Sequence, residues 1–484
     1  MRKYLVLFVA VLALVAFSTP PPASAEASIK ASGFYRAYFI LSNFHDGGGG
    51  PSLRTGRVGD EEQTNAYVAQ RFRVKFQFGN ENVKATWYLE SDMIWGDSAG
   101  STDSPAGRNF GGALGADKVQ TETKQINVWF KIPDTSVQAT VGVHTIRDAY
   151  SGVFGAANDA AGITITGMYE PVKYKLVWAK LYENDVQDPD DADLWQLEVD
   201  LAPSKDSTLG LNFYFFQDST GRNGDPTEAR LQLNAFGNLN DYAGKIYMPG
   251  IDGSFKAGPV KISGWFFYQG GKYEAKNGVG ITGTNQDLKV QGFAADLRGD
   301  FAVGPGKMFL EGLYISGDDN ENDDKFKSVI TLGDFQQNAS PGGYSGYTKT
   351  HMVMMLSTWN MATTSQCLIG CSGGEYGDSL SNSGRGLWVI AAGYNQKFNK
   401  MLSGELNVGH MEAVKLYTFD KAQPNARDKD MGTEVNATVT ANVQKGLKVS
   451  LTGGYLWVGK FVRDLNQPQF KDAWTTYARV NYTY

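Results

Sequence analysis

The stretch RFRVKFQF at residues 71–78 alternates charged or polar side chains with apolar ones. Successive side chains of a β-strand point to opposite faces, so a period of two predicts a strand with two contrasting faces. Here one face carries two arginines, a lysine and a glutamine, while the other carries three phenylalanines and a valine. Such a strand suits a sheet with water on one side and an apolar medium on the other.

The same alternation recurs along most of the chain. Segments with one apolar and one polar face lie at 29–42, 83–93, 125–132, 137–143, 173–178, 195–201, 209–215, 260–268, 434–443 and 447–457. Aromatic residues make up 13% of the chain and there are 57 glycines, which suits an all-β protein with many turns. After residue 25 no apolar run approaches the length of a transmembrane helix.

The connections between these segments alternate in length. Short turns are expected at 79–82, 133–136, 170–172, 202–207, 257–259, 299–306, 398–401 and 444–446, and long Gly-, Asp- and Asn-rich stretches at the other strand ends. Tight turns at one end and long loops at the other are typical of a transmembrane β-barrel. Because hydrocarbon offers no hydrogen-bond partners, such a sheet must close on itself, with apolar side chains outside and polar ones around a wet lumen.

The number of strands follows from the same pattern. Counting the segment 347–358 gives an odd total, whereas a chain with both ends on one side of the membrane needs an even one. This segment has long polar stretches on both sides, so we assign it to a long extracellular loop at 317–385. The prediction is an antiparallel barrel of 18 strands, or of 16 if the weak strands 245–257 and 287–298 fail.

The chain begins with a predicted signal peptide at residues 1–25. Two basic residues precede an apolar core, and Ala23-Ser24-Ala25 supplies small residues for cleavage. Residues 26–484 are then expected to form one barrel domain, since no linker divides them. The formal net charge of −6 argues against a nucleic-acid partner.

The two cysteines, Cys367 and Cys371, form a C-x₃-C pair in a chain predicted to be exported. A small disulfide loop is favoured over two free thiols. The four histidines have no paired spacing, so neither zinc nor any other resident metal or cofactor is expected. The acidic stretch GDDNENDD at 317–324 lacks the spacing of an EF-hand, and a solvated loop is favoured over a Ca²⁺ site in the outer loops.

With these features together, the mature chain resembles a Gram-negative outer-membrane porin. The stretch VGVHTIRDAYSGVFGAANDAAGITIT at 141–166 is similar to the fifth strand, third loop and sixth strand of trimeric porins, and its DAAGITI end resembles porins of sulfate- and metal-reducing bacteria. The resemblance implies a homotrimer and an inward-folded constriction loop, here 146–161. The final strand YARVNYTY resembles the signal that the barrel-assembly machinery recognises, although most such strands end in Phe.

Candidate pore-lining residues come from the polar face of the first, second, third and last strands. They form a predicted basic wall of Arg36, Arg71, Arg73, Lys75, Lys84 and Arg479. General porins set such a wall against an acidic loop, so the resemblance implies that Asp148 and Asp159, with Arg147 beside them, face it from 146–161. The alternative is that these charges are solvated lumen residues at different heights. Inward aromatics at 214, 216, 265 and 267 are expected to lie under an inward loop.

The predicted function is passive diffusion of small hydrophilic solutes and ions through the outer membrane, with lipid and lipopolysaccharide as neighbours. One alternative is a substrate-selective channel for oligosaccharides, organic acids or phosphate. Another is a non-transport scaffold or adhesin built on the 317–385 loop. An enzyme is disfavoured, because no nucleophile and base stand out together in the sequence.

Overall fold

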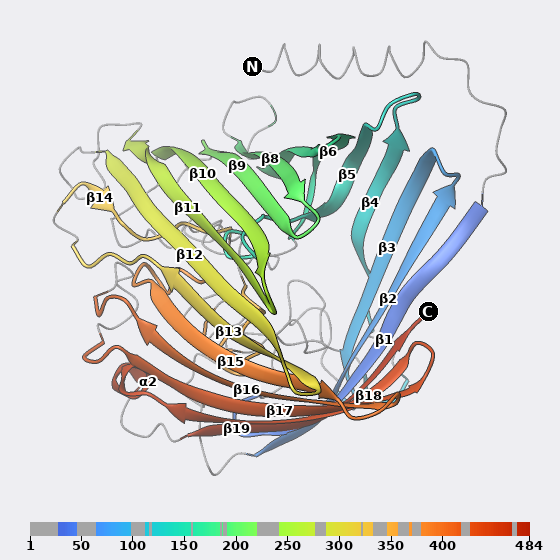
Figure 1. The fold of residues 1–484 in the computed structure, drawn as a ribbon, viewed down its shortest axis with the longest axis vertical. Helices are drawn as coiled ribbons and strands as arrows, with labels where there is room; N and C mark the ends of the chain where they lie inside the picture. The colour runs from blue at the N-terminus through green and yellow to red at the C-terminus, as the bar shows by residue number, and fades with distance from the viewer. Residues whose placement is uncertain are drawn as a thin grey trace.

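The strands of this chain follow one another around a closed ring (Figure 1). The structure, a computed structural model, describes residues 28–45, 64–97, 112–115, 119–155, 158–183, 186, 191–219, 242–275, 287–320, 323–332, 346–356, 367–369, 379–417, 426–466 and 472–484. The predicted signal peptide therefore lies outside the described residues. Long strands adjacent in sequence pair antiparallel, and β1 (Ser28–Ser42) also pairs with β19 (Ala473–Thr483), which closes the ring.

Between these two strands the ring contains the other long strands in chain order. They are β2 (Asn65–Gly79), β3 (Val83–Ile94), β4 (Glu122–Lys131), β5 (Gln138–Ile146), β6 (Asn158–Tyr169), β7 (Val172–Tyr182), β8 (Ala192–Ser204), β9 (Ser207–Asp218), β10 (Tyr242–Ala257), β11 (Val260–Ala275), β12 (Leu288–Val303), β13 (Gly306–Ile315), β15 (Leu387–Lys397), β16 (Leu402–Ala413), β17 (Asp430–Gln444) and β18 (Leu447–Val458). Within the described residues the ring therefore has eighteen long strands, and the predicted fold class is confirmed.

The two weak segments, 245–257 and 287–298, decide between 16 and 18 strands in favour of 18. Both form long strands, β10 and β12, and each pairs with a neighbour on both sides. The two-residue β14 (Lys325–Phe326) only adds to the edge of β12, so β13 pairs directly with β15. The described part of 347–358 forms no spanning strand, in agreement with its assignment to a loop.

The tight turns lie together at one end of the ring, which we call the turn end. The turn between β2 and β3 shows how the sequence builds one: the side chain of Asn80 accepts hydrogen bonds from the backbone N–H groups of Asn82 and Val83, at 2.9 and 3.0 Å. Gly79, just before it, has a φ of 136°, which a residue with a Cβ adopts only with strain. Local turn chemistry thus fixes the register of this pair.

Helix contributes little to the described structure. α2 (Lys460–Asn466) follows β18 at the loop end of the ring. No helix in the described part of the chain is both long and apolar enough to cross a membrane.

The two faces of each strand differ as RFRVKFQF predicts. On β2 the side chains of Phe72 and Phe78 point outward, and these residues are 37% and 40% exposed. Arg71 and Arg73 occupy the opposite face, and their side chains are 18% and 24% exposed. The outward positions of other strands are likewise large, apolar and exposed, among them Ile126, Leu211, Phe266, Leu297, Leu310, Ile390, Val439 and Leu451.

The C-terminal residue completes the closure. Tyr484 exchanges backbone hydrogen bonds with Gly33 on β1, at 3.1 and 3.2 Å. Its ring stacks on that of Phe72 with centroids 6.3 Å apart, outside the barrel. The last strand therefore leaves no free edge in the described ring.

The apolar exterior gives a test of what surrounds it. Val439 points outward from β17 and is 46% exposed, so an arginine there would lie in hydrocarbon if the barrel spans a membrane. We expect Val439→Arg to reduce the free energy of unfolding from lipid bilayers by about 2–4 kcal/mol if it lies near the midplane. Thr440→Arg, which points inward from the next position, should reduce it less. Equal losses in a denaturant titration would contradict the assignment of the two faces.

Candidate functional site

The segment 147–155, which we call the inner loop, lies inside the barrel against β9 and β11. Tyr150 is fully buried, with its ring centroid 4.6 Å from Phe267, 5.3 Å from Tyr214 and 5.7 Å from Trp265. The backbone N–H of Ala149 donates to the hydroxyl of Tyr214 at 2.8 Å. The inward aromatics of β9 and β11 are therefore a seat for this loop and are covered by it.

Asp148 holds the inner loop in shape. Its two carboxylate oxygens accept hydrogen bonds from the backbone N–H groups of Tyr150, Gly152, Phe154 and Gly155, at 2.8–2.9 Å. Burial raises the pKa of this carboxyl to about 6, and the four N–H donors oppose the rise, so it is ionised at neutral pH. The expectation that Asp148 presents a free carboxylate to the basic wall is therefore wrong, because its oxygens are turned into its own loop.

Asp159 lies on β6, which β5 separates from β4. It accepts hydrogen bonds from Thr145 at 2.7 Å and from Gln125 at 3.0 Å, and lies 3.6 Å from the ammonium of Lys124. Its nearest described cation is thus one that the sequence analysis did not single out. The side chain of Arg147 is exposed, and its backbone carbonyl accepts from Lys175 at 3.0 Å.

Two arginines of the predicted basic wall are paired with acids on the next strand. Arg71 donates to both carboxylate oxygens of Asp92, at 2.7 and 2.5 Å, and lies 3.2 Å from Glu90. Arg73 donates to Glu90, whose side chain is only 1% exposed. These pairs neutralise much of the charge expected here, because β2 and β3 place the residues directly opposite one another.

The other basic residues of the wall lie against aromatic rings or neutral groups. Arg36 donates to Asn481 at 2.7 Å and lies 4.1 Å from the ring of Phe34, and Arg479 lies 3.5 Å from the hydroxyl of Ser450. The ammonium of Lys75 is 4.9 Å from the ring of Tyr88, and that of Lys84 is 4.7 Å from Trp129. Cations and aromatic rings thus alternate over the inward faces of β1 to β4.

Acidic residues line the inward faces of the later strands. They include Glu198 on β8, Asp252 on β10, Asp296 on β12, Glu311 on β13, Glu405 on β16 and Glu434 on β17. The lumen therefore has a basic side and an acidic side, but the acids come from the wall and not from 146–161. The alternation of polar and apolar residues in the sequence could have located these acids, because each of them occupies an inward-facing position of its strand.

A second segment, 346–356, also lies inside the barrel, and we call it the strap. The hydroxyl of Tyr347 contacts the carboxylates of Asp296 and Glu311, and the ammonium of Lys349 lies 2.9 Å from Asp296. This part of the predicted loop 317–385 therefore folds into the barrel. The inward course of the strap could not be inferred from the polar stretches that flank it in sequence, because the acids that hold the strap come from distant strands.

The far end of the strap is held by one carboxylate. Glu434 accepts hydrogen bonds from the consecutive backbone N–H groups of Val353, Met354 and Met355, at 2.6, 2.9 and 2.9 Å. Small residues leave space here: a Cβ at Gly409 would lie 2.8 Å from the sulfur of Met352. Acidic wall residues and a glycine thus provide the seat of the strap.

The two cysteines belong to the same part of the loop. Leu368 and Ile369 donate backbone hydrogen bonds to the carbonyls of Met354 and Met355, at 2.9 and 3.3 Å. Cys367 is buried and disulfide-bonded, while Cys371 lies outside the described residues. The segment that carries the predicted disulfide therefore continues the structure of the strap.

The acidic stretch at 317–324 is bound to lysines where the structure describes it. Asp319 lies 3.0 Å from Lys415, and Asp323 lies 3.0 Å from Lys327. Asp324 is paired with Lys289 on β12. Each of these three carboxylates therefore has a lysine ammonium group as a partner in the described structure.

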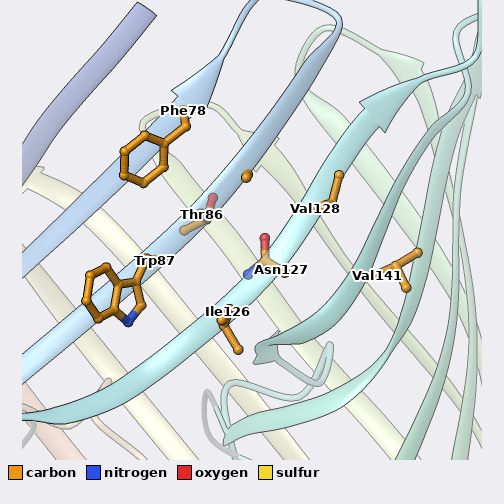
Figure 2. Close-up of a pocket in the computed structure, with 8 residues that line it drawn as sticks. Phe78, Thr86, Trp87, Ile126, Asn127, Val128 and Val141 are labelled. Carbon is orange, nitrogen blue, oxygen red and sulfur yellow. The ribbon is translucent and has the colours of Figure 1, made fainter.

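A shallow groove of about 450 Å³ lies on the outside of β2 to β5 (Figure 2). Its apolar lining includes Phe78, Trp87, Ile126 and Val141, all from the outward register. The small side chain of Ala85 leaves the open space of the groove between these larger side chains. The groove faces away from the charged residues of the lumen, so it is not part of a solute path.

Comparisons with known proteins identify the fold. No protein-family model and no curated protein matches the chain. OccAB4 from Acinetobacter baumannii aligns with a TM-score of 0.52 at 10% identity, covering 96% of this chain and all of that one. The outer membrane protein opdK from Pseudomonas aeruginosa gives 0.51 at 10% identity, and OccK8 (OprE) from the same organism gives 0.50 at 12%; each alignment covers 94% of this chain and 98% of the other. This chain therefore has the barrel fold of outer-membrane porins.

Proposed function

We propose that this protein is an outer-membrane porin through which small hydrophilic solutes and ions diffuse passively. The observation that carries the proposal is the closed ring of strands with an apolar exterior and a charged interior. A β-sheet satisfies its backbone in hydrocarbon only when it closes into such a ring, and the inward polar side chains then surround water. The fold shared with the outer membrane protein opdK supports the same conclusion.

The charges of the lumen favour the passage of anions. The acids of β3 are paired with Arg71 and Arg73, while Lys75 and Lys84 lie against aromatic rings. On the other side, several acids are engaged by the strap, among them Asp296, Glu405 and Glu434. The net field along β1 to β4 is therefore positive, and it attracts anions to that side of the lumen.

A substrate-selective channel is the second candidate. The inner loop and the strap both occupy the lumen, and they leave less space than an empty ring of this size would. The alternation of cations and aromatic rings on β1 to β4 adds contacts that an organic anion could use. Saturation of the current by such a solute would distinguish this candidate from a general pore.

The location and partners follow from the proposed function. The turn end faces the periplasm, the long loops face outward, and lipid and lipopolysaccharide surround the exterior. A homotrimer and recognition of the last strand by the barrel-assembly machinery remain predictions, as does the kinship with porins of sulfate- and metal-reducing bacteria. The pairing of Tyr484 with Gly33 supports a role of the C-terminus in closure during assembly. No catalytic role is proposed.

Planar-bilayer recording with the purified protein tests the proposal. We expect ohmic single-channel steps with small salts, without saturation as the salt concentration rises. Block at low concentrations of one organic solute would favour the selective channel. A protein that folds in detergent but never conducts would exclude both and favour a scaffold or adhesin.

Charge reversal tests the basic side of the lumen. We expect the double variant Lys75→Glu, Lys84→Glu to move the reversal potential in a salt gradient toward cation selectivity, because these ammonium groups face the lumen and are not among the acid-paired arginines. The matched control is Lys205→Glu, Lys445→Glu, which makes the same change of charge at two exposed turns. Identical reversal potentials for the two double variants would remove Lys75 and Lys84 from the ion path.

The role of the inner loop as a constriction is tested at Asp148. Each oxygen of Asp148 accepts from two backbone donors, and Asp148→Asn replaces one oxygen by an NH₂ group, so two of the four donors lose their partner, at a cost of about 1–3 kcal/mol for each buried donor. The loop should leave its seat more often, which would raise the single-channel conductance and its noise. Asp134→Asn, at the exposed turn after β4, is the control. Unchanged conductance in Asp148→Asn would mean that the inner loop does not limit the current.

A further inference from the structure

The strap is attached to the wall by a hydroxyl that lies between two carboxylates. Tyr347 contacts Asp296 on β12 and Glu311 on β13, and the two acidic side chains have no exposed surface. Tyr347 itself is fully buried. The three groups are therefore shielded from bulk solvent, and the hydrogen bonds among them depend on where their protons lie.

The number of protons needed for these hydrogen bonds constrains the protonation states of Tyr347, Asp296 and Glu311. A tyrosine hydroxyl carries one proton and can donate one hydrogen bond. Burial, together with the two neighbouring carboxylates, holds the pKa of Tyr347 well above its usual range, so the hydroxyl keeps that proton. It can donate to one carboxylate only. The second carboxyl must then carry a proton of its own and donate it to the tyrosine oxygen.

The surrounding charges agree with this count. The remaining oxygen of Asp296 lies 2.9 Å from Lys349, and that of Glu311 accepts from Arg298 at 3.0 Å. Arg298 is also paired with Asp300 at 2.9 Å. With one proton shared between Asp296 and Glu311, these two acids, Asp300, Arg298 and Lys349 are neutral as a group. Without that proton the group carries one uncompensated negative charge, which falls on the two carboxylates whose side chains have no exposed surface.

Other titratable groups near this junction lie on the strap and on two more strands. His351 of the strap pairs with Glu405 on β16, and Asp252 on β10 lies within the electrostatic range of Lys349. The pair of His351 and Glu405 is a second contact between the strap and the wall.

We propose that the strap is a pH-dependent gate, locked by the proton that Asp296 and Glu311 share around the hydroxyl of Tyr347. When alkaline medium removes this proton, the two carboxylates repel each other and only one can keep the hydrogen bond of the tyrosine. The strap then separates from β12 and β13, while Glu434 still holds its other end, and the lumen widens. This inference rests on the proposed channel function and adds a means of regulating it.

Single-channel conductance as a function of pH tests the gate. For the unsubstituted protein we expect a several-fold larger conductance in alkaline than in neutral medium. Glu311→Gln supplies a permanent N–H donor in place of the shared proton, so its conductance should stay at the low level throughout. Asp296→Asn should behave in the same way and serves as a second variant if the first does not fold. Asp134→Asn, at the exposed turn after β4 and outside the lumen, is the control and should keep the full response.

The possible outcomes of this experiment distinguish a failure of the proposed gate from a failure of the proposed channel function. An unsubstituted protein that does not conduct at any pH contradicts the proposed function. Conductance that is present but independent of pH overturns the gate alone. A pH response that persists in both Glu311→Gln and Asp296→Asn also overturns it, because another group must then be responsible.

Discussion

Backbone hydrogen bonding is the constraint on which the rest of this structure depends. In hydrocarbon an unpaired N–H or carbonyl group costs several kcal/mol, so every strand needs two neighbours. The pairing of β1 with β19, completed by Tyr484 against Gly33, removes the free edge of the described sheet. Once the ring is closed, the alternation of side chains has only one consequence: phenylalanine and leucine meet the outside, and arginine, lysine and glutamate meet the enclosed water.

Charge balance organises the interior in turn. Arginines of β2 pair with acids of β3, and carboxylates of β12, β13, β16 and β17 hold the strap through its side chains and backbone. Buried charges are stable only when they are paired or hydrogen-bonded, so the inward segments and the charged wall residues stabilise each other. The lumen that remains has a positive side at β1 to β4, and the same interactions that shape it make it sensitive to the loss of a single proton.

The sequence predicts the barrel well because its signals are local. Alternation, turn residues and loop length are each read within a few residues, and even the weak strands β10 and β12 are formed. The pairing of Arg71 with Asp92 also follows from local information, since the tight turn after Gly79 fixes which residues of β2 and β3 face each other. By contrast, the role of Asp148 depends on how its own loop folds, and the inward course of the strap depends on acids from strands far away in sequence. No periodic pattern encodes either of them.

The most direct test of the central claim is a cysteine scan of residues 71–78 with a nitroxide spin label, in a background where both native cysteines are replaced by serine. Collision rates with oxygen, which concentrates in lipid, and with a water-soluble nickel complex would be measured in bilayers. The account predicts that positions 72, 74, 76 and 78 favour oxygen and that 71, 73, 75 and 77 favour nickel. Accessibility that does not alternate along this strand, or oxygen access on the arginine face, would contradict it.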